Sequence, residues 1–194
     1  MPFVIAPLKD TKGNNGYNEY IDALRDLQNA GIHRAQQIWN GYNPGGLYPG
    51  DKEFGITQLR ANEMANDVTA TTLSGTYAFR KNIGATGWRT MFNYTTRKDV
   101  LHAFAGFAVS DEALRILQIR FEIGDRIYPI IDLHEAKLYE SFAILFKEDE
   151  GNELIAEPET RVLIKAYCDS TGFQTFFPLG FQLYKRKDLV ITET

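Results

Sequence analysis

The sequence has a single cysteine, Cys168, among its 194 residues. One cysteine cannot form an intramolecular disulfide, so a fold held together by disulfides is excluded. The surrounding residues 162–168 are strand-like, which predicts that Cys168 is a small buried hydrophobic side chain and not a nucleophile. A chain of this length buries roughly 70% of its unfolded surface and needs neither a disulfide nor a metal to fold.

Long apolar segments are missing as well. Residues 100–109 form an apolar run that is only about half as long as a membrane-spanning helix requires. Residues 1–7 have neither the basic start nor the full apolar stretch of a secretory signal. We therefore expect no membrane span, and we expect the protein to be made in the cytoplasm and to remain there unless it leaves inside a particle or by lysis.

The chain has no excess of positive charge. Its net charge is −4, its pI is about 5.4, and residues of both signs are interspersed. Proteins that bind the phosphate backbone of nucleic acids carry a basic patch, so direct nucleic-acid binding is not expected. The short basic run at 185–187 is typical of the solvated end of a strand.

Signatures of common catalytic and cofactor sites are absent from the sequence. There is no His-x-His pair of a cupin-type metal site and no G-x-S-x-G nucleophile elbow. The glycine-containing segment 43–46 neither follows an expected strand nor carries the lysine of a phosphate-binding loop. We therefore predict no cofactor and no enzymatic activity, and a cupin-like β-barrel enzyme is kept only as an alternative.

Two histidines and one acidic segment are the remaining candidates for metal ligands. His102 lies in an apolar run and is interpreted as a core or interface histidine. His134 belongs to a segment, 132–135, with the spacing of a capping box, which predicts a short helix at 133–140. Residues 148–153 are rich in carboxylates but lack the regular spacing of a calcium loop, so they are interpreted as a solvated hairpin tip.

A strand pattern is the clearest positive signal. Residues 117–123 alternate between apolar and polar side chains, as expected of a strand with one buried and one solvated face. The same period returns at 177–183, and turn signals separate many similar runs. We predict a mainly β protein whose residues 69–194 form an antiparallel, jelly-roll-like β-sandwich. The expected strands are 71–80, 87–96, 100–109, 114–123, 126–131, 141–147, 161–168 and 173–185, with a further extended piece at 188–192.

Aromatic residues make up 13% of the chain, and most of them are expected in the core of this sandwich. Trp88, Phe92 and Tyr94 have even spacing within one expected strand, which places them on a single face. Aromatic side chains that remain outside the core are available for a sugar-stacking platform or a contact between subunits.

Residues 1–68 are predicted to form an N-terminal arm with amphipathic helices and a loop rich in glycine and proline. Apolar residues recur at three- and four-residue intervals between 21 and 38, which indicates a helix. Gly31 favours an interruption, so two short helices and one long helix both remain open. A second helix is expected at 56–67. The arm must dock on its own sandwich or on a neighbouring copy, because it cannot bury its apolar face alone.

In this layout, with an extended N-terminus, a helical arm, a hinge and a compact sandwich, the chain resembles the single jelly-roll coat proteins of viruses. The resemblance covers the architecture of residues 69–192 and rests on no sequence motif, so no residue role is transferred. It implies a self-assembling structural subunit that resides in a virion and contacts further copies of itself or other structural subunits.

Two surfaces are candidates for such contacts. The first is the apolar stripe of the helical arm, formed by Ile21, Leu24, Leu27, Ile38 and Trp39. The second is the extended segment Phe3, Val4 and Ile5, which can add a strand to the open sheet edge of a neighbour.

The alternative function is that of a ligand-binding β-sandwich, either a carbohydrate-binding module or an adhesion module. Such a module needs exposed, coplanar aromatic side chains on one face of a sheet. Trp88 is the first candidate for this role.

Overall fold

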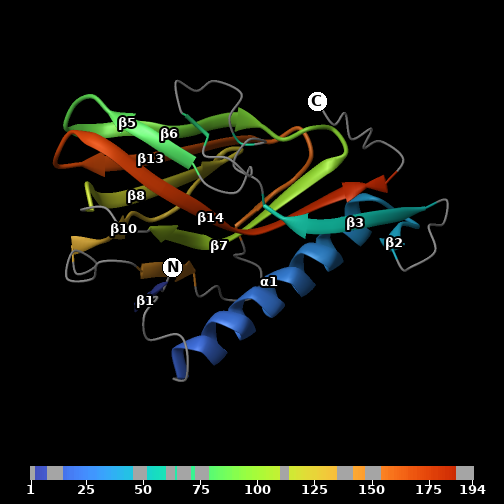
Figure 1. Cartoon of the computed structure of the whole chain (residues 1–194). Helices are drawn as coiled ribbons and strands as arrows, with labels where there is room; N and C mark the ends of the chain where they lie inside the picture. Colours follow the sequence, from blue (N-terminus) through green and yellow to red (C-terminus); the bar gives the residue numbers. More distant parts are fainter. Residues whose placement is uncertain are drawn as a thin grey trace.

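The computed structural model describes residues 3–7, 15–45, 52–59, 64, 71–72, 79–109, 114–134, 142–146 and 154–186. Within these ranges the chain forms two mainly antiparallel sheets and one long helix, α1 (Asn15–Ile38), shown in Figure 1. The two sheets face one another, so the predicted mainly β sandwich fold is confirmed. No helix in the described part of the chain is long and apolar enough to cross a membrane.

The larger sheet has a central pair of long strands, β7 (Val100–Val109) and β14 (Gly172–Lys185). Its main path runs in the order β1 (Phe3–Pro7), β11 (Phe142–Phe146), β7, β14, β3 (Glu53–Gln58) and β2 (Asn43–Pro44). Three further strands extend it, namely β12 (Ile155–Ala156) on β7, β5 (Phe79–Ile83) on β14 and β4 (Thr71–Thr72) on β5.

The smaller sheet is ordered β10 (Ile131–Asp132), β8 (Ile116–Ile123), β13 (Arg161–Cys168) and β6 (Gly87–Thr95), with β9 (Arg126–Ile127) paired to β8. The alternation that predicts β8 is reproduced in its burial. Ile119, Phe121 and Ile123 are buried, whereas the intervening polar side chains are only partly buried. The apolar face of this sheet therefore points into the sandwich and the polar face points outward.

The main core lies between the two sheets. Phe121 of β8 stacks on Phe107 of β7 with ring centroids 5.5 Å apart, and it also contacts Phe104 at 5.9 Å. Buried aliphatic and aromatic side chains of β6, β8 and β13 surround these rings. Each such side chain contributes about 1.5–3 kcal/mol through removal of its apolar surface from water.

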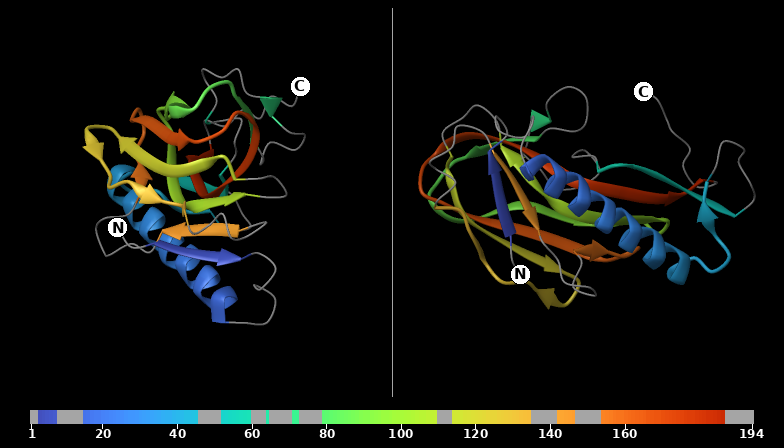
Figure 2. Two further views of the ribbon diagram at one scale, coloured as in Figure 1. Left: turned by 90° about the vertical axis from the view of Figure 1, so that its left-hand side faces the viewer. Right: turned by 90° about the horizontal axis from the view of Figure 1, so that it is seen from below.

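Helix α1 covers the opposite face of the larger sheet, so the molecule has three layers, as Figure 2 shows. Leu101, Ala103 and Ala105 of β7 face the helix, while Phe104 and Phe107 face the smaller sheet. Because β7 is buried on both faces, its sequence is almost continuously apolar instead of alternating.

The helix is uninterrupted through Gly31, so of the two predictions the single long helix is confirmed. A Cβ atom at position 31 would lie 3.3 Å from Leu183 Cδ1 and 3.7 Å from Ala103 Cβ. Glycine is used here because the helix backbone lies close to the larger sheet. Tertiary packing therefore outweighs the low helix propensity of glycine.

Several predicted elements are corrected by the structure. The expected helix at 56–67 is wrong at its start, because residues 53–58 form strand β3 and pair with β14. The expected strand 126–131 is divided into β9 and β10. Most of the predicted helix at 133–140, the acidic tip at 148–153 and the extended piece at 188–192 lie outside the described residues.

The N-terminal part of the chain contributes more to the sandwich than the sequence indicates. Strands β1, β2 and β3 all belong to residues 1–68, and all three join the larger sheet. The arm therefore supplies strands as well as a helix, and the division of the chain at residue 68 stays a prediction.

Candidate functional site

The outer face of the smaller sheet carries a row of side chains from four neighbouring strands. Trp88 of β6 is paired with Tyr167 of β13, Tyr167 with Gln118 of β8, and Gln118 with Asp132 of β10. Adjacent strands lie about 4.8 Å apart, so this row spans roughly 14 Å. We call these four residues the binding row.

Two large aromatic side chains in the binding row are exposed. Trp88 is 40% exposed and Tyr167 is 38% exposed. Their ring centroids are 5.8 Å apart and their planes meet at 74°, so the edge of one ring meets the face of the other. The expected coplanar arrangement is therefore not found. The two rings therefore form a corner.

A bulge explains why Trp88 does not share a face with Phe92 and Tyr94, as the even spacing predicts. Along β13, Ile164 is opposite Phe92 and Lys165 is opposite Thr90, so the register skips Met91. The extra residue changes which face the following side chains occupy. Trp88 consequently points outward, whereas Phe92 and Tyr94 are buried in the core.

Next to the aromatic pair lies a cluster of three charged residues. The Arg120 guanidinium carbon is 5.6 Å from the centre of the Trp88 ring, within the range of a cation–π interaction. Arg120 also donates to the Glu122 carboxylate at 2.5 Å, and Lys165 Nζ lies 3.4 Å from the same oxygen, Glu122 Oε1.

Glu122 is held in its charged form by these two cations. Desolvation acts to raise the pKa of the carboxyl group, but the hydrogen bond from Arg120 and the charge of Lys165 together outweigh it and lower the pKa. Glu122 therefore stays ionised at neutral pH and accepts from both cations.

At the other end of the row, Asp132 is also held as a carboxylate. It accepts from the backbone N–H of His134 at 2.9 Å, and this bond together with the His134 side chain lowers the pKa of Asp132. Gln118 donates to it at 3.4 Å. Residue 135 lies outside the described residues, so the predicted capping box at 132–135 stays a prediction.

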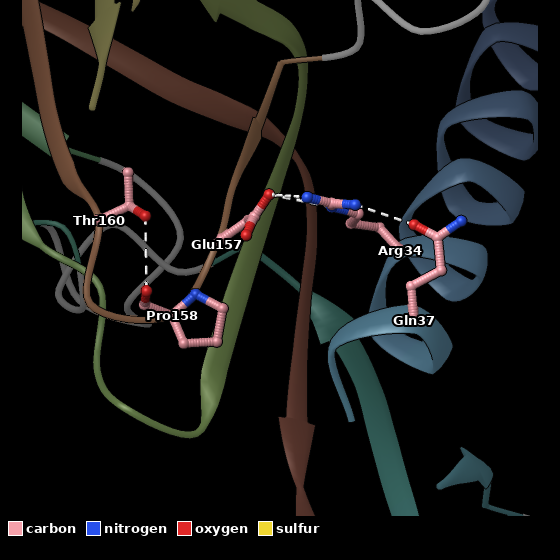
Figure 3. A network of polar contacts seen from close by, with 5 residues as sticks. All are labelled: Arg34, Gln37, Glu157, Pro158 and Thr160. Carbon is pink, nitrogen blue, oxygen red and sulfur yellow. Dashed lines mark hydrogen bonds and ion pairs between the residues drawn. The ribbon is translucent and has the colours of Figure 1, made fainter. Parts of the chain in front are cut away.

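A cleft between α1 and the edge of the sandwich is the second candidate site. It has a volume of about 690 Å³ and is lined by helix residues and by the turns that follow β8 and β12. Arg34 crosses it and donates to Glu157 at 2.9 Å and to Gln37 at 2.9 Å (Figure 3). The Arg34 and Glu157 side chains are both more than two fifths exposed, so this ion pair contributes at most about 1 kcal/mol.

The residues considered from the sequence as metal ligands or nucleophiles are not brought together in the described part of the chain. They contain no group of three or more His, Cys, Asp or Glu side chains arranged to hold a metal ion. His102 is buried, as predicted, and the Tyr94 hydroxyl lies 2.8 Å from its Nδ1 atom. Cys168 is buried, as predicted, and burial raises the pKa of its thiol to about 11.

The structure places the predicted contact stripe of the helix on its own sheet. Leu27 and Trp39 are buried in the helix–sheet core, with Leu24 and Ile38 packed against it, and Ile21 is half-buried. Most of this stripe therefore packs within one chain, and its role in a contact between copies stays a prediction.

The predicted N-terminal segment is likewise paired within the chain. Phe3, Val4 and Ile5 lie in β1, where they are opposite Phe146, Leu145 and Ile144 of β11.

The sequence points to Trp88 as a binding candidate, whereas Tyr167 is missed. The strand pattern could have identified it, because Tyr167 is separated by even intervals from Arg161 and Lys165 and therefore lies on the outer face of strand 161–168.

The sequence matches no protein-family model and no curated protein. One solved structure with some likeness is the C-terminal CBM6 domain of LamC, a marine laminarinase from Zobellia galactanivorans. The match covers 67% of this chain and 99% of that domain, with a TM-score of 0.31 and 11% sequence identity. Likeness at this level carries no weight for function, so the function must be inferred from the residues of the site.

Proposed function

We propose that this protein is a ligand-binding β-sandwich module that holds a carbohydrate chain along the binding row. The exposed pair Trp88 and Tyr167 is the observation that carries this proposal. Large aromatic side chains are normally buried, and an exposed pair backed by a rigid sheet is a preformed contact surface. A sugar ring has an apolar C–H face, which suits an aromatic ring.

The rest of the binding row supplies the polar half of the recognition. Gln118 offers both a donor and an acceptor, and the ionised Asp132 offers acceptors for sugar hydroxyl groups. All four side chains are held on strands of one sheet, so the row is elongated, with the aromatic corner at one end. This shape suits a short oligosaccharide more than a single sugar.

Replacement of Trp88 by alanine tests the proposal. Wild-type protein is screened on a glycan array, and the best oligosaccharide is titrated by calorimetry into wild type and Trp88→Ala. We expect the affinity to fall about fivefold or more, because a ring contact of this kind contributes about 1 kcal/mol or more.

Phe173→Ala is the matched control for this experiment. Phe173 is 44% exposed and carries Arg80 at 4.5 Å from its ring centre, but it lies on β14 in the larger sheet. Its loss should leave glycan affinity unchanged. Equal losses in both variants, or no glycan binding by the wild type, would contradict the proposal.

A second candidate function is self-assembly as a structural subunit of a virion-type particle. The observation that favours it is the position of β1 at the end of the larger sheet, where its outer edge has no partner strand among the described residues. Such edges pair readily with another chain.

Light scattering of the untagged protein over a concentration series tests assembly. Growth in mass that is lost on deletion of residues 1–7, with the far-ultraviolet circular dichroism retained, would support a structural subunit. A monomeric mass at every concentration would exclude it and leave the carbohydrate-binding function.

A further inference from the structure

We infer that the binding row selects acidic oligosaccharides, meaning chains that carry carboxylate or sulfate groups; this inference rests on the proposed function. The evidence is the charge arrangement beside the aromatic corner. Arg120 and Lys165 are direct cross-strand partners on β8 and β13, and their neighbours one row along are Gln118 and Tyr167.

The positive charges of Arg120 and Lys165 are only partly compensated by neighbouring carboxylates of the sheet. Like charges directly opposite on neighbouring strands are destabilising. Glu122 is the carboxylate that contacts both Arg120 and Lys165, so the three side chains together carry one net positive charge. An anionic group on the ligand would compensate for that charge.

The cations remain available to a ligand. The Arg120 and Lys165 side chains are each 31% exposed. The Arg120 Nε–H is buried and has no hydrogen-bond partner among the described residues, so the exposed part of the side chain, and not this atom, is what a ligand would contact. Since Arg120 also lies over the Trp88 ring, a sugar stacked in the aromatic corner places its substituents next to a positive charge.

The other charged groups on this face do not cancel the excess. Asp132 contributes one negative charge at the far end of the row, and Arg161, which donates to Asn93, contributes one positive charge beyond the cluster. The chain as a whole has a net charge of −4. A local positive cluster on an acidic protein attracts an anionic ligand to this face in preference to the rest of the surface.

The test compares three hexasaccharides by calorimetry at low ionic strength: a neutral β-glucan, a chain of uronic acids and a sulfated chain. We expect at least one acidic chain to bind about tenfold more tightly than the neutral chain, and we expect this preference to shrink in 0.5 M salt. The two acidic arms distinguish a carboxylate from a sulfate as the preferred group.

Lys165→Gln removes one charge and retains much of the side-chain length. It should weaken acidic binding about fivefold and leave neutral binding unchanged. Lys98→Gln is the matched control, because Lys98 is an exposed lysine in the connection between β6 and β7. Lys98→Gln should change neither the affinity for the acidic chain nor the affinity for the neutral chain.

The outcomes separate this inference from the proposed function. Equal affinity for neutral and acidic chains, with no effect of Lys165→Gln, would overturn the acidic preference and leave glycan binding in place. No glycan binding, or binding indifferent to Trp88→Ala, would overturn both. Binding of a single-stranded oligonucleotide with the same dependence on Trp88 and Lys165 would assign the site to nucleic acid instead.

Discussion

The backbone at Gly180 decides how closely the two central strands of the larger sheet approach. Gly180 has a φ of 150°, and a Cβ atom there would lie 2.0 Å from the carbonyl oxygen of Ala103. The register between β14 and β7 also shifts between Leu179 and Gly180. Any side chain at this position therefore forces the two backbones apart.

Gly180→Ala should consequently lower the free energy of unfolding by about 3 kcal/mol or more, or abolish soluble expression. Urea unfolding followed by tryptophan fluorescence measures the change. Gly84→Ala is the control, since nothing lies within 4 Å of its added Cβ, and it should be neutral or slightly stabilising. Unchanged stability of Gly180→Ala would contradict the close approach.

Burial of His102 makes stability depend on pH. Desolvation, with a smaller contribution from the charge of Arg97, lowers the pKa of His102 from 6.5 to about 3. The unfolded chain therefore binds a proton that the folded chain excludes. The stabilisation is fully present above about pH 6.5 and is lost progressively as the pH falls toward 3, at about 1.4 kcal/mol per pH unit.

His102→Gln should remove this slope between pH 6.5 and 5, where carboxylates contribute little. Unfolding free energies measured at half-unit steps give the slope for wild type and variant. The exposed His33 provides the control substitution, His33→Gln, which should leave the slope as in the wild type. A slope that survives in His102→Gln would assign the pH dependence to other groups.

Whole elements were predicted unequally well from the sequence. Strand β8 was predicted well because one of its faces is solvated and the other is buried, so its alternation is visible. Strand β3 was missed because its pairing with β14 is a long-range contact that local propensity does not encode. The bulge at Met91 was missed for a similar reason, since the shift is defined by the partner strand β13.

In the candidate site too, local features were predicted from the sequence and long-range contacts were not. Trp88 was a candidate from its residue type alone, but its contact with Tyr167 and Arg120 depends on strand order. Strand order cannot be obtained from one sequence by pattern alone. The stripe of α1 was predicted correctly as apolar, whereas its partner, the larger sheet of the same chain, was one of two possibilities that the pattern left open.

Docking of α1 on the larger sheet should contribute strongly to stability. Leu27 is buried in the helix–sheet core, so Leu27→Ala should cost about 2–4 kcal/mol in the free energy of unfolding. Arg25→Ala, on an exposed and locally paired residue of the same helix, should cost less than about 0.5 kcal/mol. Similar values for the two variants in urea unfolding would mean that the helix is not held by this face.

The three layers of the molecule explain why the smaller sheet is the one with a free face. Helix α1 occupies the outside of the larger sheet, and the space between the sheets is filled by the core. No helix or strand of the described residues covers the outer face of the smaller sheet, and this face carries the binding row. The fold thus presents exposed side chains of the smaller sheet on one side, while the helix packs on the other.

The most direct test of the account is to locate the ligand by nuclear magnetic resonance. The best-bound oligosaccharide is titrated into isotope-labelled protein, and changes in backbone amide shifts are mapped onto the structure. The account predicts that the changes centre on Trp88, Tyr167 and Gln118 in the smaller sheet. Changes confined to the cleft around Arg34 and Glu157, or no changes with any glycan, would contradict it.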